Sequence, residues 1–299
     1  MAVGVDLGGT NCRACLIDDR GRRTAERQAA FGGRDLTAEG IVALIARLVG
    51  EVRRDSIPVG VGVGVAGIFN DEGSMVRGMT NLPVLAGFAL VHHLEAALQL
   101  PVRLENDARV AMLGEARLGA ARGKRDALTI TLGTGIGGGL MLDGRIRRGF
   151  HNFAGEIGLT RVPRPAGVVE LDWVALEDVA SPGGLRRTAG LSIEQLAQEA
   201  HIGRQSAIAA LERIFSYLAA AITNAYLLLD LEMVVLAGGM AKMGQELLAA
   251  IKSAAARFCP PELLHGLQIE LAQLGDWGGA TGAACLWLGN LGAAMPALS

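Results

Sequence analysis

The same order of short segments occurs twice along this chain, and it restricts the possible folds more than any other feature. In residues 3–30, strand-like runs are joined by Gly8-Gly9-Thr10 and then by a second turn. In residues 128–148, strand-like runs are joined by Gly133-Thr134-Gly135 and again by a second turn. Tight glycine-containing turns between such runs are typical of antiparallel hairpins. The repeat predicts an internal structural duplication, with one glycine-threonine hairpin in each half.

Strand-like and helical patterns alternate after each hairpin. Apolar residues spaced three, four and seven apart predict an amphipathic helix at 39–54 and a long buried helix at 208–229. Further strands are predicted at 59–65, 102–104 and 233–237, and further helices at 87–98, from Asn106 onward, around Leu247 to Phe258, and at 278–288. Helices that follow a sheet twice over predict an α/β fold.

The length of 299 residues suits two domains of ordinary size. We expect a smaller α/β domain at residues 1–118, which contains the first hairpin. A larger α/β domain is expected at 119–299, with the second hairpin. The last helix belongs to the larger domain or packs back on the smaller one, and the sequence leaves both open.

Two matches to the dinucleotide-binding spacing G-x-G-x-x-G are present, but their context argues against such a site. They are formed by Gly62, Gly64 and Gly67 and by Gly133, Gly135 and Gly138. A dinucleotide site needs a helix that begins at the motif, because the helix N-terminus binds the pyrophosphate. Both matches are followed instead by residues with the pattern of strand and turn. The chain also lacks G-x-x-x-x-G-K-[ST], which excludes a P-loop.

A hairpin turn of glycines offers another way to bind phosphate. Glycine leaves the backbone N–H groups accessible, and a threonine hydroxyl adds a donor. Two such turns could hold the β- and γ-phosphates of a nucleotide, and Asp6, just ahead of the first turn, is placed to bind Mg²⁺ through water. Either turn alone is better explained as an ordinary β-turn. The matched contexts, together with Asp6, favour phosphate binding.

One carboxylate is placed for transfer of a phosphoryl group to a hydroxyl. Such a reaction needs a group that orients the hydroxyl and accepts its proton, and Asp107 in Leu104-Glu105-Asn106-Asp107 lies where a strand gives way to a helix. The helix dipole should keep this carboxylate ionised. Asn106 beside it could hydrogen-bond an acceptor hydroxyl. The alternative, which spacing leaves open, is that Asn106 or Asp107 only caps the helix.

Composition and charge exclude several other classes of function. The net charge is −2 and the chain is 51% hydrophobic and 19% charged, so neither a nucleic acid nor an anionic membrane is an expected partner. The most apolar stretch, 217–229, is interrupted by Asn224 and is expected to be too short for a bilayer. No signal peptide is expected, and we predict a cytoplasmic protein. Cys12 and Cys15 lie three apart on a predicted strand, so they should face opposite sides as ordinary core thiols.

Five motifs in order give the chain a family likeness. They are Asp6-Leu-Gly-Gly-Thr10, Glu105-Asn-Asp-Ala108, Leu132-Gly-Thr-Gly-Ile-Gly-Gly-Gly139, Ala154-Gly-Glu-Ile-Gly158 and Leu236-Ala-Gly-Gly239. With them the chain resembles the ROK family of sugar kinases, especially its glucokinases, from about residue 3 to 288. The resemblance implies the actin/hexokinase-like (ribonuclease H-like) ATPase fold, with two α/β domains around a cleft. It also implies ATP and Mg²⁺ as cofactors and a homodimer.

The resemblance also assigns roles to single residues. Asp107 resembles the general base that accepts the proton of the sugar hydroxyl. The residues implied in sugar binding are Gly67, Asn81, Asn106, Asp107, Glu156 and Glu177. The residues implied in binding ATP are Asp6, Gly8, Gly9, Thr10, Asn11, Gly133, Thr134, Gly135, Gly238 and Gly239. Among these, Asp6 would bind Mg²⁺ through water, and the last two glycines would lie against the adenosine.

The chain departs from the family pattern in one region. The family histidine after Gly-Glu-x-Gly is Leu159 here, and residues 161–176 contain no cysteine for the family's structural zinc. We therefore expect no zinc site. An apolar cluster is expected in its place, formed by Val168, Val169, Leu171, Trp173 and Leu176. His151 is expected to have an ordinary surface or packing role rather than to replace the lost histidine.

The expected activity is ATP-dependent phosphorylation of a hexose, with glucose to glucose 6-phosphate as the first choice. The same chemistry on N-acetylmannosamine, N-acetylglucosamine, fructose or mannose is the alternative, because Leu159 replaces a residue that contacts the sugar. A sugar-sensing repressor would need a DNA-binding domain ahead of the first strand, and a sugar-binding protein without activity would not need Asp107 and both turns. Polyphosphate in place of ATP as the donor is left open.

Overall fold

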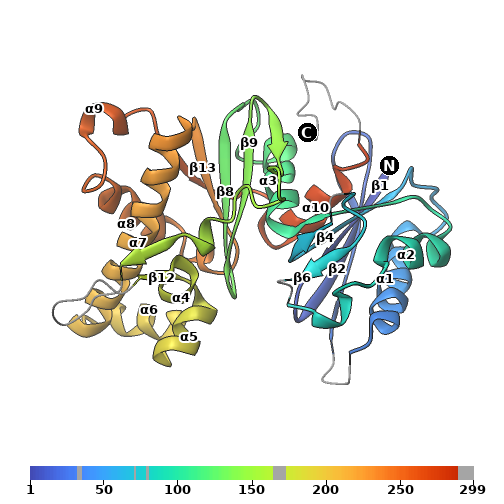
Figure 1. The fold of residues 1–299 in the computed structure, drawn as a ribbon, viewed down its shortest axis with the longest axis horizontal. Helices are drawn as coiled ribbons and strands as arrows, with labels where there is room; N and C mark the ends of the chain where they lie inside the picture. Colours follow the sequence, from blue (N-terminus) through green and yellow to red (C-terminus); the bar gives the residue numbers. More distant parts are fainter. Residues whose placement is uncertain (32–35, 71, 79–80, 164–172, 289–299) are drawn as a thin grey trace. The chain divides into compact units, whose positions relative to one another are not determined.

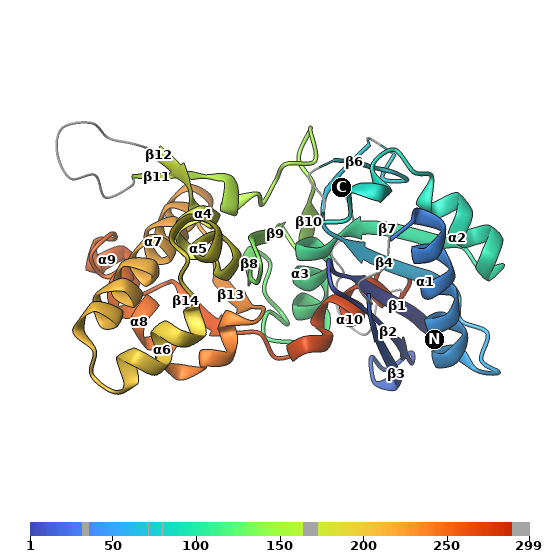
Figure 2. The same ribbon diagram turned by 90° about the horizontal axis from the view of Figure 1, so that it is seen from below.

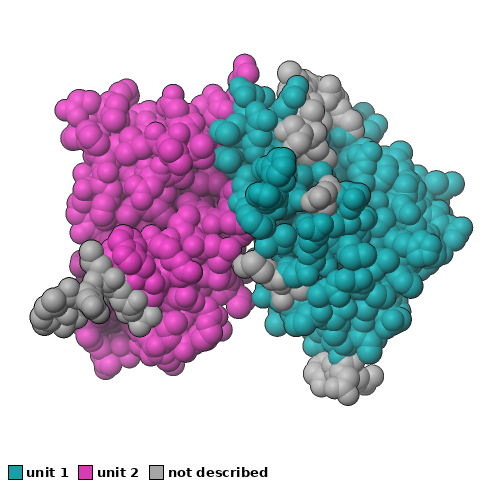
Figure 3. Space-filling view, viewed as in Figure 1, with its two compact units in different colours: residues 1–123, 139–154, 273–299 teal, residues 124–138, 155–272 magenta. Residues whose placement is uncertain are grey.

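A computed structural model of the chain describes residues 1–31, 36–70, 72–78, 81–163 and 173–288. The chain divides into two compact units, which Figure 3 shows in two colours. Unit 1 comprises residues 1–123, 139–154 and 273–299, and unit 2 comprises residues 124–138 and 155–272. The chain thus enters unit 2 near residue 124 and returns to unit 1 twice, at 139–154 and from residue 273 onward. The sequence predicted one larger domain over 119–299 and left open only whether the last helix packs on the smaller domain.

Unit 1 is built on a five-stranded sheet in the order β3-β2-β1-β4-β7. Figure 1 labels its strands β1, β2 and β4, and Figure 2 labels all five. The strands are β1 (Ala2–Leu7), β2 (Asn11–Ile17), β3 (Arg23–Ala30), β4 (Val61–Val65) and β7 (Val102–Asn106). Neighbours among β1, β2 and β3 are antiparallel, whereas β4 runs parallel to both β1 and β7. The carboxyl ends of β1, β4 and β7 therefore meet at one edge of the sheet.

Helices cover both faces of this sheet. Helices α1 (Ala38–Arg53) and α2 (Leu90–Leu98) lie on one face, and α3 (Asp107–Leu118) and α10 (Gly278–Ala284) lie on the other (Figure 2). The apolar stripe of α1 packs into the core with β1 and β4, as its periodicity predicted, with Leu44 partly buried and the rest of the stripe buried. Each large apolar side chain buried in this way stabilises the fold by about 1.5–3 kcal/mol.

Glycines allow α10 to approach the sheet. A Cβ at Gly4 would lie 1.8 Å from the carbonyl oxygen of Ala280, and a Cβ at Gly62 would lie 1.8 Å from that of Ala283. Gly62 belongs to the first G-x-G-x-x-G match, so there the glycine serves helix packing. Strand β4 leads into the short strand β5 (Ile68–Phe69), and no helix begins at the motif. The prediction against a dinucleotide site rested on the expectation that no helix begins at this motif, and that expectation is confirmed.

The two cysteines of β2 face opposite sides of the sheet, as predicted. Cys12 lies in the core beneath α1, and Cys15 lies in a second apolar cluster with Ala280 and Ala284 of α10. All four cysteines are buried free thiols. Burial raises the pKa of both Cys12 and Cys15 to about 12, which leaves them unreactive at neutral pH.

The second sheet repeats the strand order of the first: β10-β9-β8-β13-β14. Its strands are β8 (Ala127–Leu132), β9 (Ile136–Leu142), β10 (Arg145–Arg147), β13 (Met233–Ala237) and β14 (Gln268–Leu271). Strand β13 runs parallel to β8 and β14, and β10 is antiparallel to β9. The division between the two units runs through β9. The shared order confirms the internal duplication predicted from the sequence.

The helices of unit 2 follow its sheet strands. They are α4 (Leu176–Ala180), α5 (Pro182–Ala189), α6 (Ile193–His201), α7 (Gln205–Leu229), α8 (Gln245–Ala255) and α9 (Pro261–Leu264). Short elements complete the described chain: β6 (Val76–Gly78), β11 (Arg161–Pro163), β12 (Trp173–Ala175) and the 3₁₀ helices η1 (Pro83–Leu85), η2 (Ile157–Leu159), η3 (Met240–Met243) and η4 (Gly275–Trp277).

Several helix boundaries differ from the sequence prediction, and three helices show what the sequence missed. Helix α8 ends at Ala255, and Phe258, predicted on its buried stripe, is 43% exposed. Helix α10 ends at Ala284, four residues early. Helix α7 is 25 residues long, so by length and composition it could cross a membrane, contrary to the expectation for residues 217–229. Half of its most apolar window is buried inside the structure, as in the core helix of a globular unit.

Candidate active site

The carboxyl edge of the unit 1 sheet gathers four of the predicted site residues. Asp6 lies near the end of β1, Gly67 follows β4, and Asn106 and Asp107 lie where β7 meets α3. The register pairs Asp6 with Gly64, and Gly64 with Glu105. Adjacent strands lie about 4.8 Å apart, so two strand spacings separate the backbones of β1 and β7. Ligands of open α/β sheets bind at this edge.

The first glycine-threonine turn joins β1 to β2 at the same edge. The Gly8 N–H donates to the carbonyl oxygen of Asn11 at 3.0 Å, so the turn already uses this donor. Gly9 and Thr10 are exposed, and the Thr10 hydroxyl accepts a hydrogen bond from Nδ2 of Asn11 at 3.1 Å. A Cβ at Gly9 would lie 3.1 Å from the Cβ of Asn81. The structure thus places Asn81, predicted to lie near the sugar, against the first turn.

Asp6 lies beside this turn in a setting that changes its acidity. Burial, and then the negative charge of Asp107, raise the pKa of Asp6 from 3.8 to about 6. The Arg13 guanidinium, 3.8 Å from the carboxylate, lowers it in part. A Cβ at Gly279 would lie 2.8 Å from the Asp6 carboxyl carbon, so a glycine of α10 leaves room for this group. The interaction between the two carboxylates shows that Asp6 and Asp107 are close enough to repel each other.

Asn106 is the N-cap of α3, as the alternative interpretation of the sequence held. Its Oδ1 accepts hydrogen bonds from the N–H groups of Ala108 and Arg109, at 3.0 and 3.2 Å. Its Nδ2 donates to the carbonyl oxygen of Gly67 at 3.3 Å. Gly67 has a φ of +139°, which only glycine adopts readily, and this aims its carbonyl at Asn106. A primary amide has a second N–H, which is the group left to bind an acceptor hydroxyl.

Asp107 begins α3, but its acidity differs from the sequence expectation. The sequence argument was that the helix dipole stabilises the ionised carboxylate, which corresponds to a lowered pKa. In the structure, burial raises the pKa of Asp107, and the Ala108 N–H and the charge of Arg109 offset this only in part. Desolvation outweighs the helix terminus because the dipole acts weakly compared with full removal from water. The raised pKa suits a group that accepts a proton near neutral pH.

The second glycine-threonine turn, in unit 2, is fastened from behind by α4 and α5. The Thr134 carbonyl oxygen accepts hydrogen bonds from the Ser181 hydroxyl at 3.0 Å and from the Gly183 N–H at 2.9 Å. The Glu177 carboxylate accepts the Ile136 N–H at 3.4 Å. Glu177, predicted to bind sugar, thus lies against the second turn. A Cβ at Gly135 would lie 2.6 Å from its Oε2, so the carboxylate packs directly on this glycine.

Glu156 also belongs to unit 2, where it begins η2 and is half-buried. Gly155 packs on β9, because a Cβ at Gly138 would lie 2.1 Å from the Gly155 carbonyl oxygen. Gly138 therefore serves close packing, and no helix follows the second G-x-G-x-x-G match. Leu159 at the end of η2 is 37% exposed. The exposed His151 lies in unit 1 against the ring of Phe150.

The region of the missing zinc motif is only partly described. Val168, Val169 and Leu171 of the expected apolar cluster lie outside the described residues. Leu176 is buried, whereas Trp173 is 54% exposed. Within the part of the chain that the structure describes, no group of three or more His, Cys, Asp or Glu side chains could hold a metal ion.

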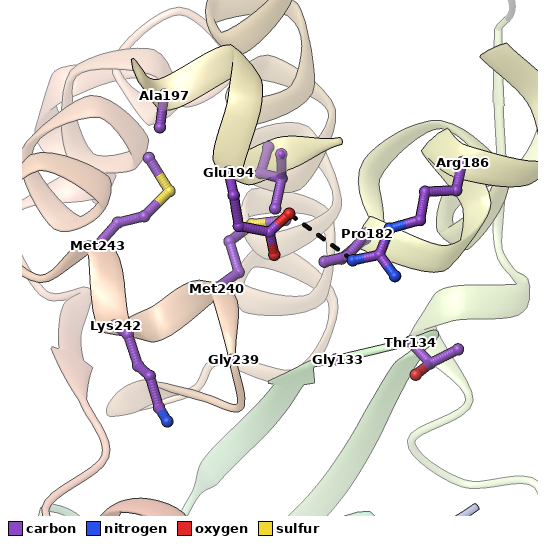
Figure 4. A pocket seen from close by; sticks show the side chains of 11 residues that line it. Gly133, Thr134, Pro182, Arg186, Glu194, Ala197, Gly239, Met240, Lys242 and Met243 are labelled. Carbon is purple, nitrogen blue, oxygen red and sulfur yellow. Dashed lines mark ion pairs between the residues drawn. The ribbon is translucent and has the colours of Figure 1, made fainter. Parts of the chain in front are cut away.

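A pocket of about 540 Å³ opens in unit 2 beside the second turn (Figure 4). Gly133 and Thr134 form one side, and Gly239 forms part of another. Its apolar walls come from α5, α6 and η3, through Pro182, Ile193, Ala197, Met240 and Met243. Arg186 and Glu194 approach each other over it at 3.7 Å. Gly238, just outside the lining, has a φ of +90° and packs on Leu132.

The sequence did not identify the side chains of this pocket, apart from its glycines and Thr134. They come from residues 182–197 and 240–243, two segments far apart in the chain, and neither forms a motif by itself. The one local signal is Ser181-Pro-Gly-Gly184, which has the serine and the proline of a helix start. The sequence also gave no role to Glu105, which is buried within the fold and forms ion pairs with Arg109 and Arg148.

Comparisons with known proteins agree with this arrangement. The ROK family model matches residues 2–290. A glucokinase of Halalkalibacterium halodurans is 31% identical over 312 residues, which cover 96% of this chain and 94% of that protein. An N-acetyl-D-glucosamine kinase of Pectobacterium atrosepticum is 29% identical, with 96% and 99% covered. The crystal structure of a ROK family glucokinase from Streptomyces griseus in complex with glucose and AMPPNP matches with a TM-score of 0.79 at 29% identity, over 96% of this chain and 98% of that one. The predicted α/β fold of the actin/hexokinase type is thereby confirmed.

Proposed function

Because the chain belongs to the ROK family, we propose that this sugar kinase transfers the γ-phosphoryl group of ATP to the 6-hydroxyl of glucose. One observation carries the proposal: Asp6, beside the first glycine-threonine turn, and Asp107, at the start of α3, lie at the same edge of the sheet. They are close enough that the charge of Asp107 contributes to the raised pKa of Asp6. A phosphate-side carboxylate and an acceptor-side carboxylate within electrostatic reach of each other are what phosphoryl transfer to an alcohol requires.

Asp107 is proposed to orient the attacking hydroxyl and to accept its proton. Its raised pKa favours this role, because a base accepts a proton most effectively when its pKa is near the working pH. The second N–H of Asn106 is proposed to bind a neighbouring sugar hydroxyl. The remaining sugar ligands are proposed from family resemblance, and they are Gly67, Asn81, Glu156 and Glu177.

The pocket of unit 2 is proposed to bind the adenosine of ATP. Its volume is within the range of small-molecule sites, and its walls are apolar with a few polar groups at the rim. Gly133 and Thr134 line it, so a nucleoside there would have its phosphates beside the second turn. Gly238 and Gly239 would lie against the nucleoside. Polyphosphate has no base to fill such a pocket, which favours ATP as the donor.

Asp6 fits a magnesium ion that enters with the nucleotide. Mg²⁺ is usually held by one or two carboxylates, waters and substrate phosphates rather than by a protein cage. A single carboxylate with a pKa of about 6, ionised at neutral pH, matches that requirement. When bound, the ion would neutralise charge on the β- and γ-phosphates. Asp6 would hold it through water, and Thr10 with Asn11 would bind phosphate oxygens.

A second candidate is the same reaction on another sugar. The relative from Pectobacterium atrosepticum acts on an N-acetylated sugar, and Leu159 stands where the family has a sugar-contacting histidine. N-acetylglucosamine, N-acetylmannosamine, mannose and fructose are therefore the sugars to compare with glucose. A sugar-binding regulator without activity is disfavoured by the presence of Asp107 and both turns.

The test is release of ADP from Mg-ATP with each of these sugars, and with polyphosphate as an alternative donor. We expect the highest kcat/KM with glucose and ATP, and glucose 6-phosphate as the product by ³¹P NMR. No ADP release with any of the sugars would refute the kinase assignment. Higher kcat/KM on an N-acetylated sugar would replace glucose by the second candidate. We also propose a cytoplasmic homodimer, which light scattering of the purified protein would check.

A further inference from the structure

Glu105 forms the centre of a charged cluster inside unit 1. It lies next to the last residue of β7 and is 3% exposed. Its Oε1 accepts the Asn106 N–H at 2.9 Å and lies 3.0 Å from Nε of Arg109, whose side chain is 2% exposed. Its Oε2 contacts Arg148 through two nitrogens, Nε at 2.8 Å and an Nη at 2.7 Å. Both carboxylate oxygens are therefore engaged.

Arg148 comes from a distant part of the chain. It follows β10 and forms the base of a closed loop, because its own carbonyl oxygen accepts the Ala154 N–H at 3.0 Å. Gly149 has a φ of +75° and packs against Ala154. The loop base is thus fixed by backbone contacts, and the Arg148 side chain is free to serve the contact with Glu105. A side-chain substitution there removes that contact without opening the loop.

The cluster acts on the segment that carries Asp107. The Glu105 carboxylate holds the N–H of the next residue, so it restrains the peptide that leads into α3. It also holds the guanidinium of Arg109, whose charge lowers the pKa of Asp107. Arg148 donates to the other carboxylate oxygen, Oε2, so the two arginines hold opposite ends of the same carboxylate. The orientation of the Glu105 carboxylate therefore depends on Arg148.

Stability alone is a weak explanation for such an arrangement. Removing charges from water is costly, and replacing a buried ion pair with apolar side chains is often neutral or stabilising. What buried ion pairs with good geometry do provide is a defined orientation. Two guanidinium nitrogens on one carboxylate define an orientation more sharply than the point charge of a lysine.

We propose that Arg148, acting through Glu105, is a positioning residue for the Asp107 carboxylate. The inference rests on the proposed function in so far as Asp107 is the base. Its structural part, that Arg148 fixes residues 104–109, stands apart from that function. Placement of a reacting group matters strongly for rate, since a displacement of about 1 Å can change a rate about 100-fold.

The test compares three variants of the full-length protein: Arg148→Ala, Arg148→Lys and Arg147→Ala. Arg147 is the matched control, because it stands next in the chain and pairs with Asp143, which is 68% exposed, at 3.0 Å. The first measurement is amide hydrogen exchange of peptides that cover 104–110, which needs neither sugar nor nucleotide. We expect exchange there to accelerate at least about tenfold in Arg148→Ala, less in Arg148→Lys, and not in Arg147→Ala.

The second measurement is kcat together with the equilibrium dissociation constant of glucose. We expect kcat to fall at least about tenfold in Arg148→Ala, with glucose affinity within about threefold, because base placement acts on the transition state. Arg148→Lys should show a smaller loss of kcat than Arg148→Ala. If Arg148→Ala does not fold, Arg148→Lys takes its place in both measurements. Unchanged exchange at 104–110 would overturn the structural part, whether or not the protein is a kinase. Accelerated exchange with an unchanged kcat would overturn the positioning of Asp107, whereas a silent wild type would instead refute the proposed function.

Discussion

The two glycine-threonine turns share one pattern in the sequence, but the structure supports them in different ways. The first turn, Gly8-Gly9-Thr10, joins the two strands of a hairpin, β1 and β2, and the carboxylate of Asp6 lies beside it. The second turn, Gly133-Thr134-Gly135, is held from behind by hydrogen bonds to Ser181, Gly183 and Glu177, around one wall of a pocket. The first turn is thus set by charge, and the second by packing and hydrogen bonds.

This difference suggests a division of tasks within the duplicated fold. The charged side chains that suit the reacting phosphate, the metal and the acceptor hydroxyl lie in unit 1. The rigid scaffold that suits a nucleoside lies in unit 2. Substitutions around the first turn should therefore lower catalytic activity while leaving the free energy of unfolding nearly unchanged or even raising it. Substitutions around the second turn should lower stability and nucleotide affinity together.

The largest effect is expected at Asp107 in unit 1. Asp107→Asn removes the proton acceptor while keeping the size of the side chain, so kcat should fall by about 10²–10⁴-fold. Glucose affinity should stay within a few-fold, because the substituted amide still hydrogen-bonds a hydroxyl. Rapid-quench or steady-state ADP release, with calorimetry for sugar binding, measures both. A kcat close to that of the wild type would remove Asp107 as the base.

The next effect is expected at Asp6, where activity and stability should move in opposite directions. The folded-state pKa of about 6 exceeds the usual 3.8, so between these pH values the folded state binds more protons than the unfolded state. The free energy of unfolding therefore falls as pH rises through this range. Asp6→Asn should remove that loss and stabilise the ligand-free protein at pH 7–8 by up to about 3 kcal/mol.

The same Asp6→Asn variant should bind Mg-ATP at least about tenfold more weakly, because the proposed magnesium ligand is lost. Thermal unfolding at pH 4 and at pH 8, with and without Mg-ATP, separates the two effects. At pH 4 the variant and the wild type should differ little. A variant that is less stable at pH 8 would show that the ionised Asp6 stabilises the fold, and this would contradict the charge-based account of the first turn.

A smaller effect, on stability first, is expected behind the second turn. Ser181 is fully buried, caps α5 through the Gly184 N–H at 2.9 Å and contacts the Thr134 carbonyl. Ser181→Ala should lower the free energy of unfolding by about 2 kcal/mol, since a helix cap is lost and the Thr134 carbonyl keeps only one of its two donors, the Gly183 N–H. The KM for ATP should rise a few-fold.

Ser192→Ala is the matched control for this prediction. Ser192 is half-buried and caps α6 through the Gln195 N–H at 3.4 Å, while its hydroxyl donates to Glu194 at 2.5 Å. Neither contact involves the second turn. Loss of this cap should cost about 1 kcal/mol and leave the KM for ATP unchanged. Denaturant unfolding of both variants gives the difference. Equal costs for the two serines would mean that the hydrogen bond to Thr134 adds nothing to the second turn.

The sequence predicted the parts of this comparison that depend on local spacing. The two turns, the strands on either side of each turn and the helix start at Asn106 all follow from residues close together in the chain. The acidity of Asp107 could not be predicted correctly, because its burial depends on elements far away in the sequence. The same applies to the pocket, whose wall residues Ile193 and Met240 are 47 positions apart, and to Glu105 and Arg148. No periodicity or motif links such positions.

The smallest effect is expected at the rim of the pocket, and it marks the limit of the comparison. The Arg186 and Glu194 side chains are 60% and 62% exposed and 3.7 Å apart. An ion pair so exposed contributes less than about 1 kcal/mol and weakens with salt. Arg186→Ala should therefore change the KM for ATP less than about threefold. Arg187→Ala, on the same helix and paired with Asp178 outside the pocket lining, is the control. A tenfold rise in the KM for ATP in Arg186→Ala, but not in Arg187→Ala, would mean that charge contributes to nucleotide binding in unit 2 as well. The contrast between a first turn governed by charge and a second turn governed by packing would then no longer hold.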